Sequence, residues 1–197
     1  ETVPGTNVQV VLINAADKPH QTLAIRGPAN LINAREDAEY LQTYNEALGI
    51  YLHSGFDEDS RKIYQRILPL LDKEKPVEVT GHSLGAAIAT VLMMYFDQDG
   101  YSLVPTFNFG QPKVTNKEGA AKFSHLPITR VIDENDMVPL VPFVTLLDSV
   151  HGQYEHFGDA IVLLENQYFV FQSMAEQEQD HADSFWWNLT DLSVKAH

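Results

Sequence analysis

The sequence contains no cysteine, few basic residues and no long hydrophobic run, and each absence excludes a class of protein. Without cysteine there can be no disulfide, no thiolate metal site and no cysteine nucleophile. Lysine and arginine number 13 against 27 aspartate and glutamate, which gives a net charge of −14. This charge argues against nucleic acid as a partner, because phosphate binding requires cationic side chains. No run approaches the roughly 18 uninterrupted apolar residues of a membrane helix.

The composition that remains is that of a globular domain. The 197 residues contain no internal repeat, low-complexity segment or linker, so we predict a single domain over residues 1–197. The first residue is Glu1 rather than Met, which indicates a processed or trimmed N-terminus. Secretion after removal of an export signal is compatible with this start, and the compartment and the oligomeric state stay open.

Strand-like and helix-like runs alternate along the chain. Strand-like runs cover residues 8–13, 22–25, 48–53, 77–80, 104–109, 128–132, 161–165 and 168–171. Helix-like runs cover residues 57–71, 86–96 and 118–123, and a last one follows His181 and carries two tryptophans. Alternation of this kind predicts an α/β fold with helices on a mostly parallel sheet, mixed because the first and last pairs of strands form hairpins.

One pentapeptide carries the strongest chemical signal. The run Gly81-His-Ser-Leu-Gly85 follows a β-branched strand and precedes a helix rich in small residues. A Gly-x-Ser-x-Gly sequence in this context predicts a sharp turn that exposes the Ser83 hydroxyl as a nucleophile. Gly81 and Gly85 leave room for the turn and for close packing of the strand against the helix.

A serine hydroxyl becomes a useful nucleophile when a histidine accepts its proton and a carboxylate orients that histidine. In this type of sheet the chain order is serine, acid, histidine. Asp133 and Asp136 directly follow the strand over 128–132 and therefore lie at the edge of the sheet where the turn also emerges. The histidines that follow Ser83 are His125, His151, His156, His181 and His197. Order and placement leave Asp133 against Asp136, and His151 against His156, undecided.

Six ordered segments resemble the fungal-type triacylglycerol lipase family, the class 3 lipases. They are Ile25-Arg-Gly27, His53-Ser-Gly-Phe56, Thr80-Gly-His-Ser-Leu-Gly85, Phe109-Gly-Gln-Pro-Lys-Val-Thr-Asn116, Asp136-Met-Val-Pro139 and His156-Phe-Gly158. The resemblance implies the α/β-hydrolase fold, with a central mostly parallel mixed sheet and helices on both faces. It implies a catalytic triad of Ser83, Asp136 and His156 that hydrolyses lipid esters without a cofactor or a metal. The short interval from Asp136 to His156 indicates a compact, bacterial member.

The oxyanion hole is where the sequence departs from this family. One donor is expected to be the backbone N–H of Leu84, the residue after the nucleophile. The family's second donor follows the Arg-Gly pair and is usually Ser or Thr, whereas here it is Pro28, which has no N–H. Either Ala29 supplies the missing donor, or the enzyme is slow, or the chain has lost catalysis.

Two apolar segments are candidates for contact with substrate. Leu31 and Ile32 occupy the place of the family's lid, and Phe143, Leu146 and Leu147 lie between the acid and the base. Both sets also suit ordinary packing. The expected partner is a lipid ester, met at a lipid–water interface. The alternatives are a phospholipase A1 and a lipase-like binding protein without strong activity.

Overall fold

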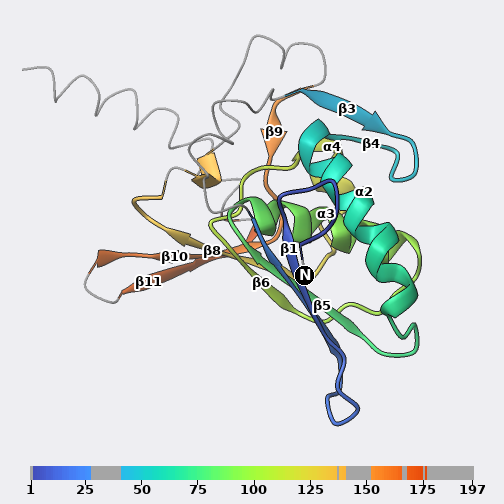
Figure 1. Cartoon of the computed structure of the whole chain (residues 1–197). Coiled ribbons are helices and arrows are strands. Elements are labelled where there is room, and N and C mark those ends of the chain that lie inside the picture. Colours follow the sequence, from blue (N-terminus) through green and yellow to red (C-terminus); the bar gives the residue numbers. More distant parts are fainter. Residues whose placement is uncertain are drawn as a thin grey trace, which may run out of the picture.

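A seven-stranded sheet forms the centre of the molecule (Figure 1). The computed structural model describes residues 2–27, 41–136, 138–140, 152–165, 168–174 and 176. In sheet order the strands are β1 (Gln9–Ile13), β2 (Gln21–Arg26), β5 (Val77–His82), β6 (Thr106–Phe109), β8 (Ile128–Asp133), β10 (Asp159–Leu163) and β11 (Phe169–Gln172). The two edge strands, β1 and β11, pair antiparallel with their neighbours, and the five strands between them run parallel. The predicted mixed sheet with hairpins at its edges is therefore confirmed.

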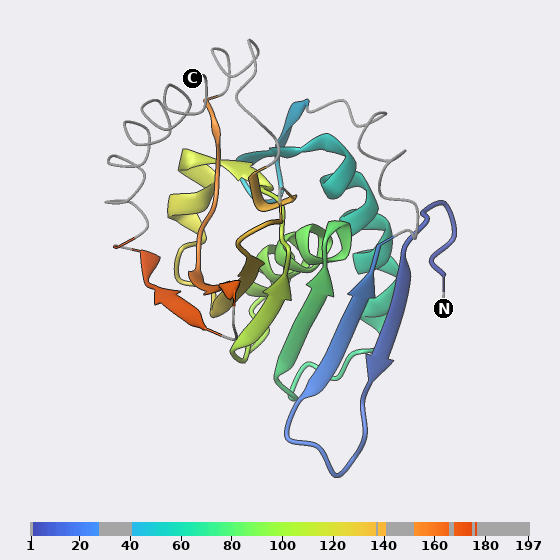
Figure 2. The ribbon, with the colours of Figure 1, turned by 90° about the vertical axis from the view of Figure 1, so that its left-hand side faces the viewer.

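Helices α2 (Ser54–Ile67) and α3 (Leu84–Gln98) build the core on one side of this sheet (Figure 2). α3 packs on β5 and β2, and α2 packs on α3. Every residue of α3 from Gly85 to Phe96 is buried, as its nearly continuous apolar sequence predicts. In β5, burial alternates, so Val77, Val79 and Gly81 are buried whereas His82 is exposed.

A second, smaller sheet was not predicted as a unit. It contains β3 (Gln42–Asn45), β4 (Ile50–His53), β7 (Thr115–Asn116) and β9 (Tyr154–Glu155), all paired antiparallel. β7 and β9 are only two residues long and pair across a large sequence separation, so neither leaves a periodic signal. The pairing matters for the site because β9 leads directly into His156.

The remaining elements differ from the predictions mainly at their ends. α2 begins at Ser54, three residues before the predicted start, and ends at Ile67, where the 3₁₀-helix η1 (Leu68–Leu70) with Pro69 follows. The short helix α4 (Lys117–Lys122) and the 3₁₀-helix η2 (Val138–Leu140) complete the described elements. The helix predicted after His181 lies outside the described residues. Within the described parts of the chain, no helix is both long enough and apolar enough to span a bilayer.

Candidate active site

Ser83 is the single residue that links the end of β5 to the start of α3. Its backbone angles are φ 54° and ψ −123°, and it is the only non-glycine residue with a positive φ in the described part of the chain. Such a conformation costs on the order of 1–3 kcal/mol and persists only where the surroundings fix it. The Ser83 N–H is fixed by donation to the Phe109 carbonyl at 2.8 Å. The predicted sharp turn at Ser83 is present.

The two glycines of the turn are required by close backbone contacts. A Cβ added to Gly81 would lie 2.3 Å from the Gly85 carbonyl oxygen. A Cβ added to Gly85 would lie 2.4 Å from the Ile25 carbonyl oxygen. Both distances are far below van der Waals contact, so strand and helix approach more closely than any side chain would permit. The sequence-based explanation of Gly81 and Gly85 is confirmed.

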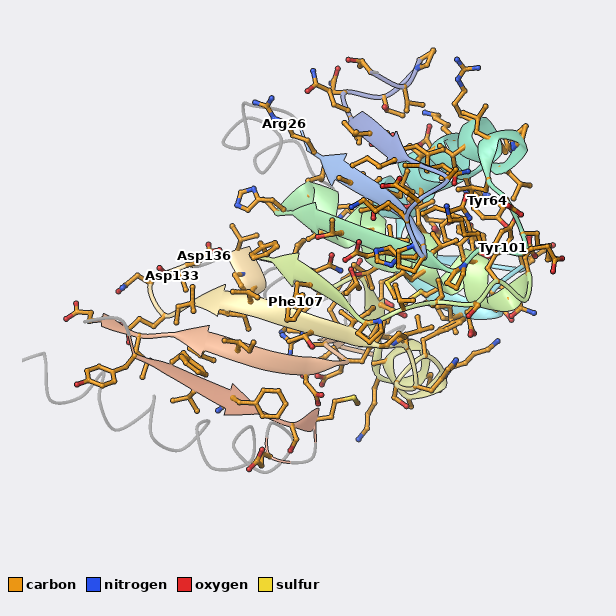
Figure 3. All side chains as sticks on the ribbon, turned by 90° about the horizontal axis from the view of Figure 1, so that it is seen from below. Arg26, Tyr64, Tyr101, Phe107, Asp133 and Asp136 are labelled. Carbon is orange, nitrogen blue, oxygen red and sulfur yellow. The ribbon has the colours of Figure 1, made fainter. Side chains whose placement is uncertain are left out.

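Asp136 lies three residues beyond the end of β8. Figure 3 shows Asp136 and Asp133 at the edge of the sheet where the parallel strands end. Arg26, the last residue of β2, lies at the same edge. Asp136 Oδ1 accepts a hydrogen bond from the Val138 N–H at 2.9 Å. Asp133 is exposed, and its Oδ1 accepts from the Asn135 N–H at 2.9 Å. Asp133 therefore shapes the turn that precedes Asp136.

The end of β6 connects Ser83 with Asp136. Phe109 accepts the hydrogen bond from the Ser83 N–H, and Gly110, the next residue, has φ +54°. A Cβ added to Gly110 would lie 2.8 Å from Asp136 Oδ2. The predicted nucleophile and the predicted acid thus lie next to consecutive residues at the end of β6. Sequence reasoning gave Gly110 no role, although it lies inside a family-like segment.

His156 lies between β9 and β10, and its ring contacts the segment that follows Asp136. Nε2 is 2.6 Å from the Pro139 carbonyl oxygen. A carbonyl oxygen only accepts, so Nε2 carries the hydrogen in this contact and Nδ1 is the proton acceptor of the neutral ring. The interaction ties His156 to η2 through its Nε2–H.

The other predicted residues divide into those that the structure describes and those that it does not. Leu84 is the first residue of α3, and Gly27 packs against it, because an added Gly27 Cβ would lie 3.0 Å from Leu84 Cβ. His125 is exposed beside Asp97, with Nε2 3.1 Å from the carboxylate. The predicted residues that lie outside the described ranges are Pro28, Ala29, Leu31, Ile32, Phe143, Leu146, Leu147, His151, His181 and His197.

The described residues offer a nucleophile at a helix N-terminus and an acid next to Gly110, the residue after the one that accepts the Ser83 N–H. α3 has 15 residues, and its first N–H groups point toward the position of Ser83, which favours a negative charge developing there. Within the described residues no group of three or more His, Cys, Asp or Glu side chains could hold a metal ion. This arrangement suits acyl transfer to a serine.

Comparison with known proteins gives the family. The family described as "Lipase (class 3)" matches residues 22–146, a range that includes Ser83 and Asp136 and ends before His156. The chain is 31% identical to triacylglycerol lipase OBL1 of Ricinus communis over 140 residues, which are 60% of this chain and 26% of that protein. It is 29% identical to secreted mono- and diacylglycerol lipase 1 of Fusarium solani over 124 residues, which are 58% of this chain and 37% of that protein.

Solved structures agree with the fold. Lipase II from Rhizopus niveus superposes with a TM-score of 0.77 at 22% identity, over 89% of this chain and 69% of that one. This likeness confirms the α/β-hydrolase fold. The chain spans only 26% and 37% of the two curated relatives named above. The family match covers well over half of the chain, and the protein belongs to the class 3 lipase family.

Proposed function

We propose that this chain is a serine hydrolase of carboxylic esters that acts on lipids. The observation that carries the proposal is the strained backbone of Ser83 at the N-terminus of a buried 15-residue helix, beside a dipeptide that also contacts Asp136. A structural turn would not need a non-glycine residue at φ 54°. Strain of this kind is characteristic of sites where one side chain must be presented.

In the proposed reaction the Ser83 hydroxyl attacks the ester carbonyl while a histidine accepts its proton. The tetrahedral oxyanion is stabilised by the Leu84 N–H and by the N-terminal end of α3. Collapse of this intermediate expels the alcohol, which receives the proton from the histidine, and leaves an acyl group on Ser83. Water, activated by the same histidine, then releases the carboxylic acid. Asp136 orients the histidine and stabilises its charged form.

His156 is the proposed base, because its ring contacts the segment that carries Asp136 and because the family resemblance selects it. One observation counts against this assignment. The Nε2–H is donated to Pro139, so in the observed orientation only Nδ1 can accept a proton from Ser83. Catalysis by His156 therefore requires either Nδ1 or a rotation of the ring. The role of each histidine has to be tested separately.

The experiment is covalent labelling of the folded protein with an alkyl fluorophosphonate, followed by peptide mapping. We expect one adduct, on Ser83, and none in Ser83→Ala.

The same labelling identifies the base and the acid. Each histidine after Ser83 is replaced by Asn or Gln in turn, and Asp136 by Asn. We expect His156→Asn to slow labelling by about a thousandfold or more, because the activating base is lost. If His156→Asn labels at the normal rate and another histidine variant loses labelling, that other histidine is the general base. If Ser83 of the wild type forms no adduct, the proposed hydrolase function is disproved.

The substrate is proposed as a lipid ester, and a panel of substrates defines its class. p-Nitrophenyl esters from acetate to palmitate report the preferred chain length, and triacylglycerol emulsions and phosphatidylcholine vesicles separate a lipase from a phospholipase A1. Higher activity above the solubility limit of the ester would support action at a lipid–water interface. Secretion is proposed from the secreted relative of Fusarium solani, and detection of the protein in culture medium tests it.

A further inference from the structure

Two side chains of β6, those of Thr106 and Asn108, hydrogen-bond to the backbone of β5, and the Asn108 side chain also reaches α3. The register pairs only Gly81 with Asn108 and His82 with Phe109. Two residues earlier in each strand, the Thr106 hydroxyl donates to the Val79 carbonyl at 2.7 Å. At Gly81, the backbone N–H donates to Asn108 Oδ1 at 3.1 Å. The side chain of Asn108 thus replaces a backbone acceptor two residues before the nucleophile.

The other end of the Asn108 carboxamide reaches the helix that follows the nucleophile. Asn108 Nδ2 donates to Thr90 Oγ1 and to Gln111 Oε1, both at 3.1 Å. The Thr90 hydroxyl in turn donates to the Ala86 carbonyl at 2.9 Å. Asn108 and Thr90 are completely buried and Gln111 is 1% exposed. Every hydrogen of the Asn108 amide has an acceptor and its oxygen has a donor, so the orientation of the group is fixed.

Asn108 therefore contacts the chain on both sides of Ser83. Gly81 lies two residues before Ser83, and Ala86 and Thr90 belong to the first two turns of α3. We propose that Asn108, anchored on α3 by Thr90, is a positioning residue that holds β5 and α3 in the geometry required for catalysis at Ser83. This inference rests on the proposed hydrolase function.

The proposal has a kinetic consequence. The Ser83 Oγ and the Leu84 N–H must both meet the same carbonyl carbon and oxygen in the transition state. A change in the angle between β5 and α3 moves these two groups relative to each other. Misplacement by about 1 Å can cost about a hundredfold in rate. Asn108 and Thr90 are completely buried and therefore do not contact a substrate, so kcat should fall whereas KM is retained.

The chain offers a matched pair of variants. Asn108→Leu leaves the buried Gly81 N–H without its acceptor and can fail to fold, so the milder Thr90→Val is the main test. Thr106→Val is its control: both hydroxyls are buried, both donate to a backbone carbonyl, and both lie near the β5–β6 junction. Only Thr90 also accepts from Asn108. The two variants should therefore lose similar stability and differ in reactivity.

The experiment measures fluorophosphonate labelling, kcat and KM, together with amide hydrogen exchange at Gly81, Ala86 and Ala87. The last two donate to the Ser83 carbonyl at 2.9 and 3.2 Å. We expect Thr90→Val to lower the labelling rate and kcat by about tenfold with KM unchanged, and to speed exchange at all three amides. Thr106→Val should leave these rates within about twofold of wild type.

The outcomes separate this inference from the proposed function. If the wild type does not label at all, the hydrolase fails, and hydrogen exchange alone decides the positioning role. Faster exchange at the three amides in Thr90→Val, but not in Thr106→Val, then supports it. Equal effects of the two variants on exchange, or equal effects on labelling in an active enzyme, overturn the proposal.

Discussion

At the scale of single residues, Gly110 is a position where both the backbone angle and a close contact require glycine. Its φ of +54° favours glycine, and an added Cβ would lie 2.8 Å from Asp136 Oδ2. We predict that Gly110→Ala displaces the Asp136 carboxylate and lowers ester hydrolysis by about ten- to a hundredfold. Gly100→Ala is the control, because Gly100 has φ +73° with nothing within 4 Å of an added Cβ. Both variants should lose about 1–2 kcal/mol of stability from the left-handed backbone, measured by urea unfolding. Equal activity per folded molecule in the two variants would contradict the role of Gly110.

The residue scale also shows where prediction from the sequence ends. Ser83 and its two glycines could be predicted because the reason for each lies within five consecutive residues. The roles of Gly110 and Asn108 could not be predicted, because each depends on a residue from another part of the sheet. Gly110 lies against Asp136, which follows β8. Asn108 accepts from Gly81, which belongs to β5. Asparagine within a strand-like run has no local explanation, since it disfavours strands on its own. Only the tertiary structure shows what its carboxamide contacts.

At the scale of elements, a buried polar cluster joins β3, α2 and α3. Asn45 Nδ2 donates to Asp57 Oδ1 at 2.8 Å and to the Tyr95 hydroxyl at 2.6 Å, and Tyr95 donates to Asp57 Oδ1 at 2.8 Å. Arg61 lies 3.3 Å from the other carboxylate oxygen of Asp57. Burial, followed by the hydrogen bond to Asp57, raises the pKa of Tyr95, so the hydroxyl stays protonated and can donate.

We predict that Tyr95→Phe lowers the free energy of unfolding by about 1–3 kcal/mol, because a buried carboxylate and a buried amide each lose a partner. Tyr64→Phe is the matched control. The Tyr64 hydroxyl also donates to an aspartate, Asp99, but near the surface, where water can replace it. Its loss should cost within about 0.5 kcal/mol. Urea unfolding of the two variants gives the comparison, and equal losses would mean that the cluster adds no stability beyond a surface contact.

Most local elements were predicted, but β3, which pairs with β4 across a short turn, was missed. The hairpins at both edges follow from short turns, and α3 follows from its apolar run. The start of α2 was predicted at Asp57 because acidic residues mark helix N-termini. In the structure the helix starts at Ser54, whose N–H donates to the Leu41 carbonyl, a long-range contact that the sequence does not reveal.

At the scale of the whole molecule, stability should depend on pH through one buried histidine. His53 is 3% exposed, and its ring stacks on Phe56 with centroids 4.0 Å apart. Burial lowers the pKa of His53 from 6.5 to about 4. Above pH 6.5 the ring is neutral in the folded and the unfolded chain alike, and this contribution to stability is complete. Between pH 6.5 and 4 the unfolded chain binds a proton that the folded protein excludes, so stability falls with falling pH.

This linkage gives a prediction that a single substitution can isolate. A pKa that differs by about 2.5 units corresponds to about 3 kcal/mol lost between pH 6.5 and 4, at about 1.4 kcal/mol per pH unit. His53→Phe keeps a flat ring against Phe56 and removes the titration. The 27 carboxylates titrate in both proteins and cancel in the difference. Urea unfolding from pH 7.5 to 4.5 should therefore show wild type losing stability more steeply than His53→Phe below pH 6.5, with parallel curves above it. Parallel curves over the whole range would mean that His53 is protonated equally in the folded and unfolded protein, and acid sensitivity would then have to arise from the carboxylates alone.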